Sequence, residues 1–280
     1  MWSRFCDKNE LAKQKGMSVM KKVFQCAWIG MVLLFLYAPI LILAVYSFTE
    51  STMIGAIRGF SLKNYITLFT TPELLQMIFG TITLAFIVAV FSTILGTAGA
   101  VGTFYSKKNS QRIIELANQI PVVNADVVTG FSICILLIVF FNMEKESFIP
   151  LLVGQMTLCT PFVYLQVMPR LQQMDPHLYE AALDLGCDTR QALVKVTLPQ
   201  IWPAVLSGFM TAITLSLDDY FISTYTKPAT FDTISTYVVN ATKGSQTEIK
   251  TALWALSTII FVLVVLMTVA ANKLPEVEEE

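Results

Sequence analysis

Long apolar stretches alternate along the chain with shorter polar ones. Stretches long enough to cross a hydrocarbon core of about 30 Å as helices lie at residues 24–48, 75–104, 122–141, 149–168, 202–225 and 251–271. This pattern predicts an all-α polytopic membrane protein with six transmembrane helices. The predicted organisation is a polar N-terminal segment (1–22), a transmembrane domain (23–272) and an acidic tail (273–280).

Small residues recur at every fourth position in two of these spans. They are Ser92, Gly96 and Ala100 in the second span, and Ala204, Gly208, Ala212 and Ser216 in the fifth. Small side chains let two helices approach closely. We therefore expect each stripe to be buried against a neighbouring helix.

A polar, charged segment separates the fourth span from the fifth and is too short to cross a membrane. Asp175 is a natural N-cap for a helix that Gly186 ends. A second short helix can begin at Asp188 or Thr189, and Pro199 is expected to end it. The segment is therefore predicted to form two short helices joined at a glycine elbow. By its apolar stripe alone, an amphipathic hairpin lying on the bilayer surface fits equally well.

The same segment carries a motif at fixed spacing. Glu180-Ala181-Ala182 is followed by Gly186 and then by Leu198-Pro199, with Val196 where isoleucine is usual. The pattern resembles the EAA loop of ABC importer permeases. The resemblance implies a type I ABC importer permease fold, with residues 175–199 as a cytoplasmic loop that docks on a separate ATPase. It assigns ATPase coupling to Glu180, Ala181, Ala182, Gly186, Leu198 and Pro199.

The distribution of basic residues predicts the orientation. Of the 19 Lys and Arg residues, 13 lie in the N-terminal segment, the second and fourth loops and the tail, and 6 lie in the other loops. The positive-inside rule therefore places both termini and the 175–199 loop in the cytoplasm. The acidic tail does not oppose this orientation, because carboxylates contribute little to it.

Composition excludes several classes of protein. With 55% hydrophobic and only 14% charged residues, the chain is not an ordinary soluble domain, and a net charge of −1 implies no nucleic-acid partner. The five cysteines show no paired spacing and are interpreted as free thiols. No phosphate-binding loop or zinc motif occurs, and the single histidine, His177, is expected to be solvated. We therefore expect no enzyme activity and no cofactor in this chain, with ATP and Mg²⁺ bound by a partner ATPase.

Three aspartates in or near the apolar spans are the candidates for substrate contact, because a carboxylate near the bilayer centre costs roughly 2.5–3.5 kcal/mol. Asp218 continues a polar row on the fifth span, formed with Ser207, Thr211 and Thr214. Asp219 is turned about 100° away and could hold a neighbouring helix, while Asp126 is expected in the inner part of the third span. Separated acids with aromatic neighbours such as Tyr220 suit an elongated organic cation. Each aspartate could instead cap an interrupted helix.

A narrower resemblance rests on three further stretches: Tyr37-Ala38-Pro39-Ile40, the run from Thr157 to Val163, and Thr214-Leu215-Ser216-Leu217-Asp218-Asp219. They are similar to the C-type permease subunit of spermidine/putrescine ABC importers. The combined expectation is a substrate path at Asp126, Asp218, Asp219, Tyr220, Tyr65, Thr211 and Thr214. The implied setting is a multi-pass protein of the bacterial plasma (inner) membrane. The implied partners are a related permease in a heterodimer, an ATPase dimer at the EAA loop, an extracellular or periplasmic polyamine-binding protein, and membrane lipid.

Two alternatives of other classes remain open at this point. One is a permease of the same fold for another small cationic or polar solute, such as a metal ion or an amino acid. The other is a secondary transporter or a structural membrane protein, neither of which needs an ATPase. Inverted repeats would mark a secondary transporter, and we find none in the sequence.

Overall fold

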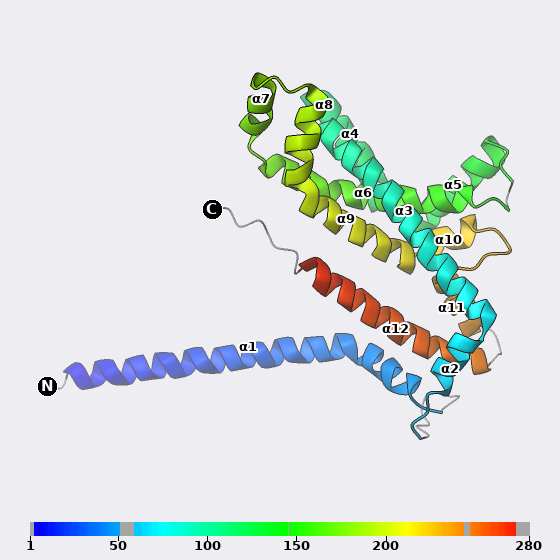
Figure 1. Ribbon diagram of the computed structural model, residues 1–280. Coiled ribbons are helices and arrows are strands. Elements are labelled where there is room, and N and C mark those ends of the chain that lie inside the picture. The colour runs from blue at the N-terminus through cyan, green and yellow to red at the C-terminus, as the bar shows by residue number, and fades with distance from the viewer. Residues whose placement is uncertain (1–2, 51–58, 145, 244–246, 273–280) are drawn as a thin grey trace.

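The structure, a computed structural model, describes residues 3–50, 59–144, 146–243 and 247–272, and these are almost entirely helical (Figure 1). Extended structure in these ranges is limited to one antiparallel bridge between Thr49 and Phe60. The prediction of an all-α protein is therefore confirmed. The elements in chain order are α1 (Ser3–Ser47), α2 (Lys63–Thr70), α3 (Pro72–Phe104), α4 (Lys108–Val123), α5 (Asp126–Ile135), the π-helical turn η1 (Leu136–Phe140), α6 (Ile149–Gln173), α7 (Pro176–Asp184), α8 (Thr189–Ala192), the π-helical turn η2 (Leu193–Thr197), α9 (Leu198–Asp218), α10 (Phe221–Thr226), α11 (Ile234–Lys243) and α12 (Thr247–Asn272).

The described helices match the six-span prediction approximately. Four segments are long and apolar enough to cross a membrane on their own: Gln25–Ser47 within α1, Pro72–Phe104, Ile149–Gln173 and Thr189–Asp218. Taken together, α4 and the α5–η1 helix make a fifth, although the two parts are bent by 105°. The sixth expected span corresponds to α12, whose described apolar part is Ala252–Leu266.

The three helices α3, α6 and α9 pack against one another to form the centre of the bundle (Figure 1). Val163 of α6 lies between two glycines there. A Cβ atom added at Gly96 would lie 2.8 Å from Val163 Cβ, and one added at Gly208 would lie 3.1 Å from Val163 Cγ1. Backbones therefore approach closely where the sequence has small residues. The expected burial is confirmed for the stripe of the second span, since Ser92, Gly96 and Ala100 are all buried; in the fifth span Gly208, Ala212 and Ser216 are buried, whereas Ala204 is only half-buried.

A second cluster of buried residues packs α2 and the start of α3 against α12. Leu68 of α2, Leu74 of α3 and Leu253 and Leu256 of α12 are buried together. The first helix packs along α12 and otherwise projects away from the bundle (Figure 1). Its large side chains, Trp28 to Leu36 among them, are mostly exposed, as befits a helix in contact with lipid.

The third span differs from its prediction as a continuous helix over residues 122–141. Helix α4 ends at Val123, and α5 begins only at Asp126. Pro121 weakens the last turn of α4 because it lacks an N–H. Asn124 then takes an extended conformation, with its Nδ2 donating to Thr129 Oγ1 at 3.2 Å. The helix is therefore interrupted at residues 124–125, close to where the continuous span was predicted to begin.

The fifth span also differs from the predicted continuous helix over residues 202–225. Helix α9 ends at Asp218 and α10 begins at Phe221, because the Asp219 carboxylate accepts the backbone N–H groups of Ile222 and Ser223. A side chain that satisfies the free N–H groups of a new helix turn favours a fresh helix start.

At its other end, the same span begins earlier than predicted. Pro199 was expected to end a separate short helix, but residues 189–218 form one continuous helical segment. The widened turn η2 lies just before Pro199, where a proline ring would clash with the carbonyl four residues earlier in an ordinary α-helix. The predicted acidic tail, residues 273–280, lies outside the described residues, and the predicted N-terminal segment is, from Ser3, the beginning of α1.

Candidate coupling loop and acidic cavity

The loop that contains α7 has the predicted helix start and elbow. The Asp175 carboxylate accepts a hydrogen bond from the backbone N–H of His177 at 2.9 Å, which caps α7. Gly186 has φ +87°, a left-handed conformation in which residues with a Cβ are strained. Both features are local: the Asp175 cap fixes the start of α7, and Gly186 turns the chain between α7 and α8.

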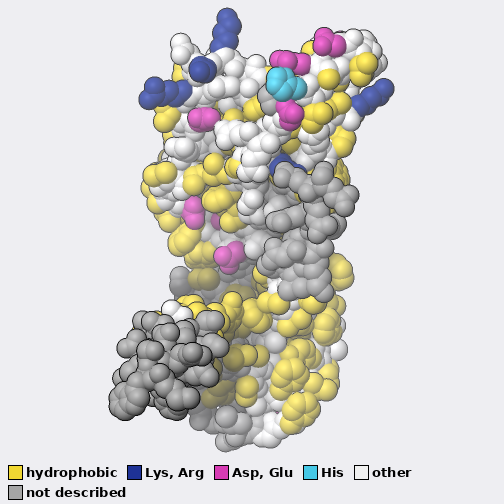
Figure 2. All heavy atoms as spheres, turned by 90° about the vertical axis from the view of Figure 1, so that its left-hand side faces the viewer, with side chains coloured by type: hydrophobic (Ala, Val, Ile, Leu, Met, Phe, Trp, Pro, Cys, Tyr) yellow, Lys and Arg dark blue, Asp and Glu magenta, His cyan; other side chains and the backbone are white. Residues whose placement is uncertain are grey.

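Helix α7 and the residue that follows it have an inner and an outer face. Ala182 is buried against the body of the protein, whereas Leu185 is 87% exposed. The Glu180 carboxylate lies 3.7 Å from His177 Nδ1, and both side chains are highly exposed. Charged side chains gather at the end of the molecule that carries α7, above a broad hydrophobic surface (Figure 2). The loop thus presents an exposed mixed surface, while Leu198 of the motif packs against the central core.

Asp219 belongs to a buried polar network between α6, α9 and α10. Its Oδ2 accepts from the Ser223 hydroxyl at 2.7 Å, the Ser223 N–H at 2.8 Å and Gln155 Nε2 at 3.3 Å, while its Oδ1 accepts from the Ile222 N–H at 3.1 Å. The Gln155 Oε1 atom in turn accepts from the Ser216 hydroxyl at 2.7 Å. All four of these hydrogen bonds to Asp219 come from groups at the junction of α6, α9 and α10.

Asp218 has the opposite environment. It is exposed, and it lines a cavity of about 570 Å³ between α1, α9, α11 and α12. Thr214 and Tyr220 line the same cavity, together with apolar side chains such as Val238 and Ile260. Among the described residues, no hydrogen bond or ion pair neutralises the Asp218 carboxylate. The cavity therefore combines the Asp218 carboxylate, the two aromatic rings of Tyr220 and Phe261, a few hydroxyl groups and apolar walls.

The other expected path residues do not line this cavity. The Thr211 hydroxyl donates to the Ser207 carbonyl of its own helix, and the Tyr65 hydroxyl is hydrogen-bonded to Ser47 Oγ, at the end of α1, at 2.9 Å. Asp126 was expected in the inner part of a continuous third span. It is instead the exposed first residue of α5, where a carboxylate is favoured by the positive end of the helix dipole.

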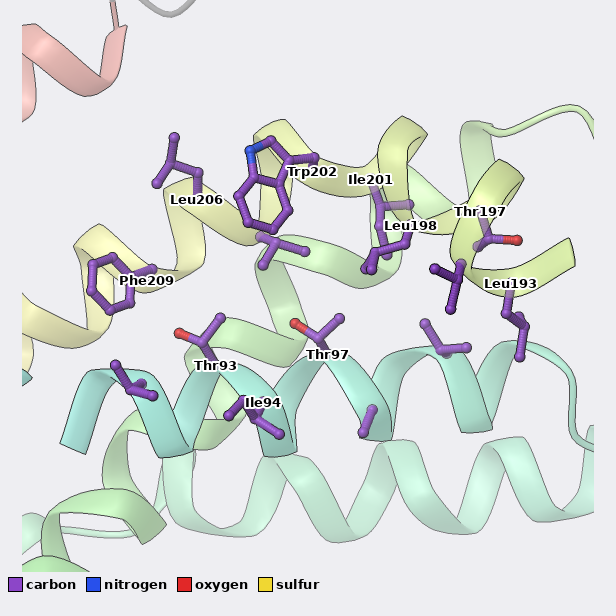
Figure 3. Close-up of a pocket in the computed structure, with 15 residues that line it drawn as sticks. Thr93, Ile94, Thr97, Leu193, Thr197, Leu198, Ile201, Trp202, Leu206 and Phe209 are labelled. Carbon is purple, nitrogen blue, oxygen red and sulfur yellow. The ribbon is translucent and has the colours of Figure 1, made fainter. Parts of the chain in front are cut away.

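A second cavity, of about 650 Å³, lies between α3 and the η2–α9 segment (Figure 3). Its wall is almost entirely apolar and includes Ile94, Trp202 and Phe209. Figure 3 shows Thr93 and Thr97 of α3 turned toward α9, and their hydroxyls have no hydrogen-bond partner among the residues that the structure describes. Its lining contains no charged side chain, so it lacks a group that would neutralise a cation.

Sequence reasoning missed Gln155, which is fully buried in α6 and contacts three members of the network. The same rule that drew attention to the aspartates could have found it, because an amide inside an apolar span also needs a partner. What the sequence does not contain is the identity of that partner, since Gln155 and Asp219 are 64 positions apart.

Comparisons with known proteins agree with this architecture. The family "Binding-protein-dependent transport system inner membrane component" matches residues 105–274. Over 240 residues the chain is 31% identical to the spermidine/putrescine transport system permease protein PotC of Escherichia coli (strain K12), covering 85% of this chain and 88% of that protein. It is 32% identical over 200 residues to the putrescine transport system permease protein PotI of the same organism, covering 68% of this chain and 70% of that protein.

Among solved structures, a chain of a bacterial ABC transporter involved in the import of the acidic polysaccharide alginate superposes with a TM-score of 0.74 at 18% sequence identity, covering 95% of this chain and 100% of that chain. At that identity the likeness concerns the fold alone. The match to residues 105–274 spans more than half of the 280-residue sequence, and the chain therefore belongs to the family of binding-protein-dependent transport system inner membrane components.

Proposed function

We propose that this chain is the permease subunit of an ABC importer that carries polyamines such as spermidine and putrescine into the cell. In this proposal it pairs with a related permease and receives substrate from a polyamine-binding protein outside the membrane. An ATPase dimer that docks at α7 drives transport and binds the ATP and Mg²⁺. Both termini and the 175–199 loop lie in the cytoplasm, as the distribution of Lys and Arg predicts.

The observation that carries the choice of substrate is the contrast between two adjacent aspartates. Asp219 is buried and accepts four hydrogen bonds from its own protein, which already stabilise its carboxylate. Asp218 is exposed at the cavity and has no partner among the described residues. A carboxylate in an apolar cavity is costly unless a cation neutralises it. The free carboxylate is therefore suited to a substrate ammonium group.

The remainder of the cavity suits the rest of a polyamine. Its volume, about 570 Å³, lies within the range of about 300–1,000 Å³ that is usual for small-molecule sites. The ring of Tyr220 can contact an ammonium group through its π face. The apolar walls formed by Leu217, Val238 and Ile260 suit the methylene segments between the charges. The relatives named for putrescine and spermidine transport support the same assignment.

The test is ATP-driven uptake by the complete transporter in liposomes, with this chain, its partner permease, the ATPase and the binding protein. We expect labelled spermidine or putrescine to accumulate only with ATP. Replacing Asp218 by Asn removes the charge but keeps the size, and at limiting substrate it should lower uptake about tenfold, since losing a charged partner weakens a hydrogen bond by about 1–1.5 kcal/mol. Glu146→Gln, which removes an exposed carboxylate outside the cavity, should leave uptake unchanged.

The outcomes separate the alternatives. Equal uptake by the wild type and Asp218→Asn, with both complexes assembled, contradicts the role of Asp218 and makes Asp126 the next charge to test. Polyamine uptake without ATP indicates a secondary transporter. ATP-dependent uptake of another cation or polar solute, with none of polyamines, indicates a permease of the same family for that solute.

A further inference from the structure

We propose that Tyr105 is a positioning residue that ties α7 to the start of the fifth span, so that the ATPase moves α3, α7 and α9 as one unit. The inference rests on the proposed function, because it requires α7 to be the element on which the ATPase acts. Tyr105 lies outside the EAA motif and follows directly on the last residue of α3.

Three elements meet at the Tyr105 side chain. Its ring centroid lies 4.7 Å from that of Tyr179 on α7, at an interplanar angle of 40°. Its hydroxyl lies 3.3 Å from Thr197 Oγ1, at the end of η2. The ring of Phe104, the last residue of α3, packs edge-on against it at 5.0 Å. One side chain thus touches the coupling helix and the turn from which α9 continues, and it is anchored at the end of α3.

The position of this contact gives it mechanical importance. Along the chain, α7 connects to the membrane helices on one side through the elbow at Gly186, a residue without a side chain to pack. Thr197 is buried, with 1% exposure, and leads directly into Leu198 of α9. A push on α7 can bend the elbow without moving α9 unless α7 is also held from the side. Helix α7 packs on η2 directly, and the Tyr105 ring adds a second lateral contact, from the end of α3.

The segment that Tyr105 contacts is itself adaptable. The turn η2 has the wide π-type hydrogen bonding that often marks functional positions in helices. The hydroxyl of its last residue, Thr197, is hydrogen-bonded to the hydroxyl of Tyr105. Holding this residue fixes where the wide turn ends, and therefore the direction in which α9 leaves the coupling loop.

The first experiment measures coupling in the reconstituted complete transporter, as uptake of labelled polyamine per ATP hydrolysed. Tyr105→Leu removes both contacts and should lower this ratio about two- to tenfold, as expected for the loss of an aromatic pair. Tyr105→Phe keeps the ring contact with Tyr179 but removes the hydroxyl contact with Thr197, so it should lower the ratio less than Tyr105→Leu does. Tyr179→Leu should reproduce the defect of Tyr105→Leu. The matched control is Phe91→Leu, which removes an exposed ring from the same helix α3 and should change nothing.

A double variant decides whether the two rings act together. If they act through one contact, Tyr105→Leu combined with Tyr179→Leu should be no worse than either single variant. Additive defects, or a wild-type ratio in Tyr105→Leu, would overturn the inference. A general loss of folding would instead lower uptake and ATP hydrolysis alike, and it would not be lessened in a graded way by phenylalanine at position 105, which keeps only the ring contact.

A second experiment does not depend on the ATPase. In the purified full chain in detergent, trypsin cleavage after the exposed Arg190 of α8 reports local opening of the coupling loop. Tyr105→Leu and Tyr179→Leu should each accelerate this cleavage about two- to tenfold, whereas Phe91→Leu should not. If the wild-type transporter shows no ATP-dependent uptake, the proposed function fails, and unchanged cleavage in Tyr105→Leu would then overturn the linkage as well.

Discussion

Replacing Asp219 by Asn should destabilise the protein without acting on the cavity. The two oxygens of Asp219 accept four hydrogen bonds, three at Oδ2 and one at Oδ1. An asparagine has one acceptor oxygen and one NH₂ donor. If its oxygen takes the place of Oδ2, its NH₂ group faces the N–H of Ile222, and two donors then oppose each other in a buried site.

The magnitude follows from that single unsatisfied donor. Leaving a buried N–H without an acceptor costs about 1–3 kcal/mol, and the other three hydrogen bonds lose their charged acceptor. In a protein of this size, a loss of about 1 kcal/mol lowers Tm by roughly 2–4 °C. We therefore expect Asp219→Asn to lower the midpoint of thermal unfolding by roughly 2–10 °C.

The assay is thermal unfolding of the purified protein in detergent, followed by loss of the monodisperse peak in size-exclusion chromatography. The matched control is Asp218→Asn, an identical substitution at the neighbouring residue, whose carboxylate has no partner among the described residues. This control should unfold at the wild-type temperature. The hydrogen-bond reasoning is refuted if Asp219→Asn unfolds at the wild-type temperature or if Asp218→Asn lowers the midpoint by as much.

Three further predictions concern the elbow, the helix contacts and the cavity. Gly186→Val places a β-branched residue at φ +87°, which costs about 1–2 kcal/mol in the left-handed region. This variant should abolish uptake but still insert into the membrane, as measured by immunoblot of the membrane fraction. Wild-type uptake in this variant would contradict the coupling role of Gly186. Gly96→Ala brings a Cβ to 2.8 Å from Val163 and should lower stability by about 1–3 kcal/mol, whereas Gly102→Ala, with no atom within 4 Å, should not lower Tm and should raise it slightly, because alanine favours the helix more than glycine does. Asp218→Glu keeps the charge and should reduce uptake less than Asp218→Asn; a defect as large as that of Asn would argue against a charge-based role.

Features set by neighbouring residues could be predicted from the sequence. The cap at Asp175 and the elbow at Gly186 depend on local hydrogen bonding and on a single backbone angle, and both occur where expected. The burial of small-residue stripes such as Ser92–Gly96–Ala100 follows from helical periodicity. Periodicity also placed Asp218 and Asp219 on different faces, which their environments reflect.

Features that depend on distant partners could not be predicted. An apolar pattern shows where a helix can exist, but it does not show where a buried side chain interrupts it. The break after Asp218 requires Ile222 and Ser223 to donate to Asp219, and Gln155 of another helix to hold that carboxylate in place. The continuation of the helix past Pro199 likewise depends on the wide turn η2, because proline alone predicts a helix end.

The placement of Val163 between Gly96 and Gly208 has a consequence for how this protein can change over evolutionary time. The two glycines lie on different helices and far apart in the sequence, yet they share one neighbour. Both glycines therefore face the same side chain, that of Val163, and compete for the space around it. A methyl group gained at Gly208 meets Val163 Cγ1 first, at 3.1 Å, and can be accommodated if the residue at position 163 becomes smaller, so the effect of a substitution at one of these positions depends on the residue at the other. At Gly96 the backbone carbonyl of Thr160, 2.9 Å from an added Cβ, holds the glycine in place as well. Such epistasis lets the bundle keep its shape while its residues vary as a set.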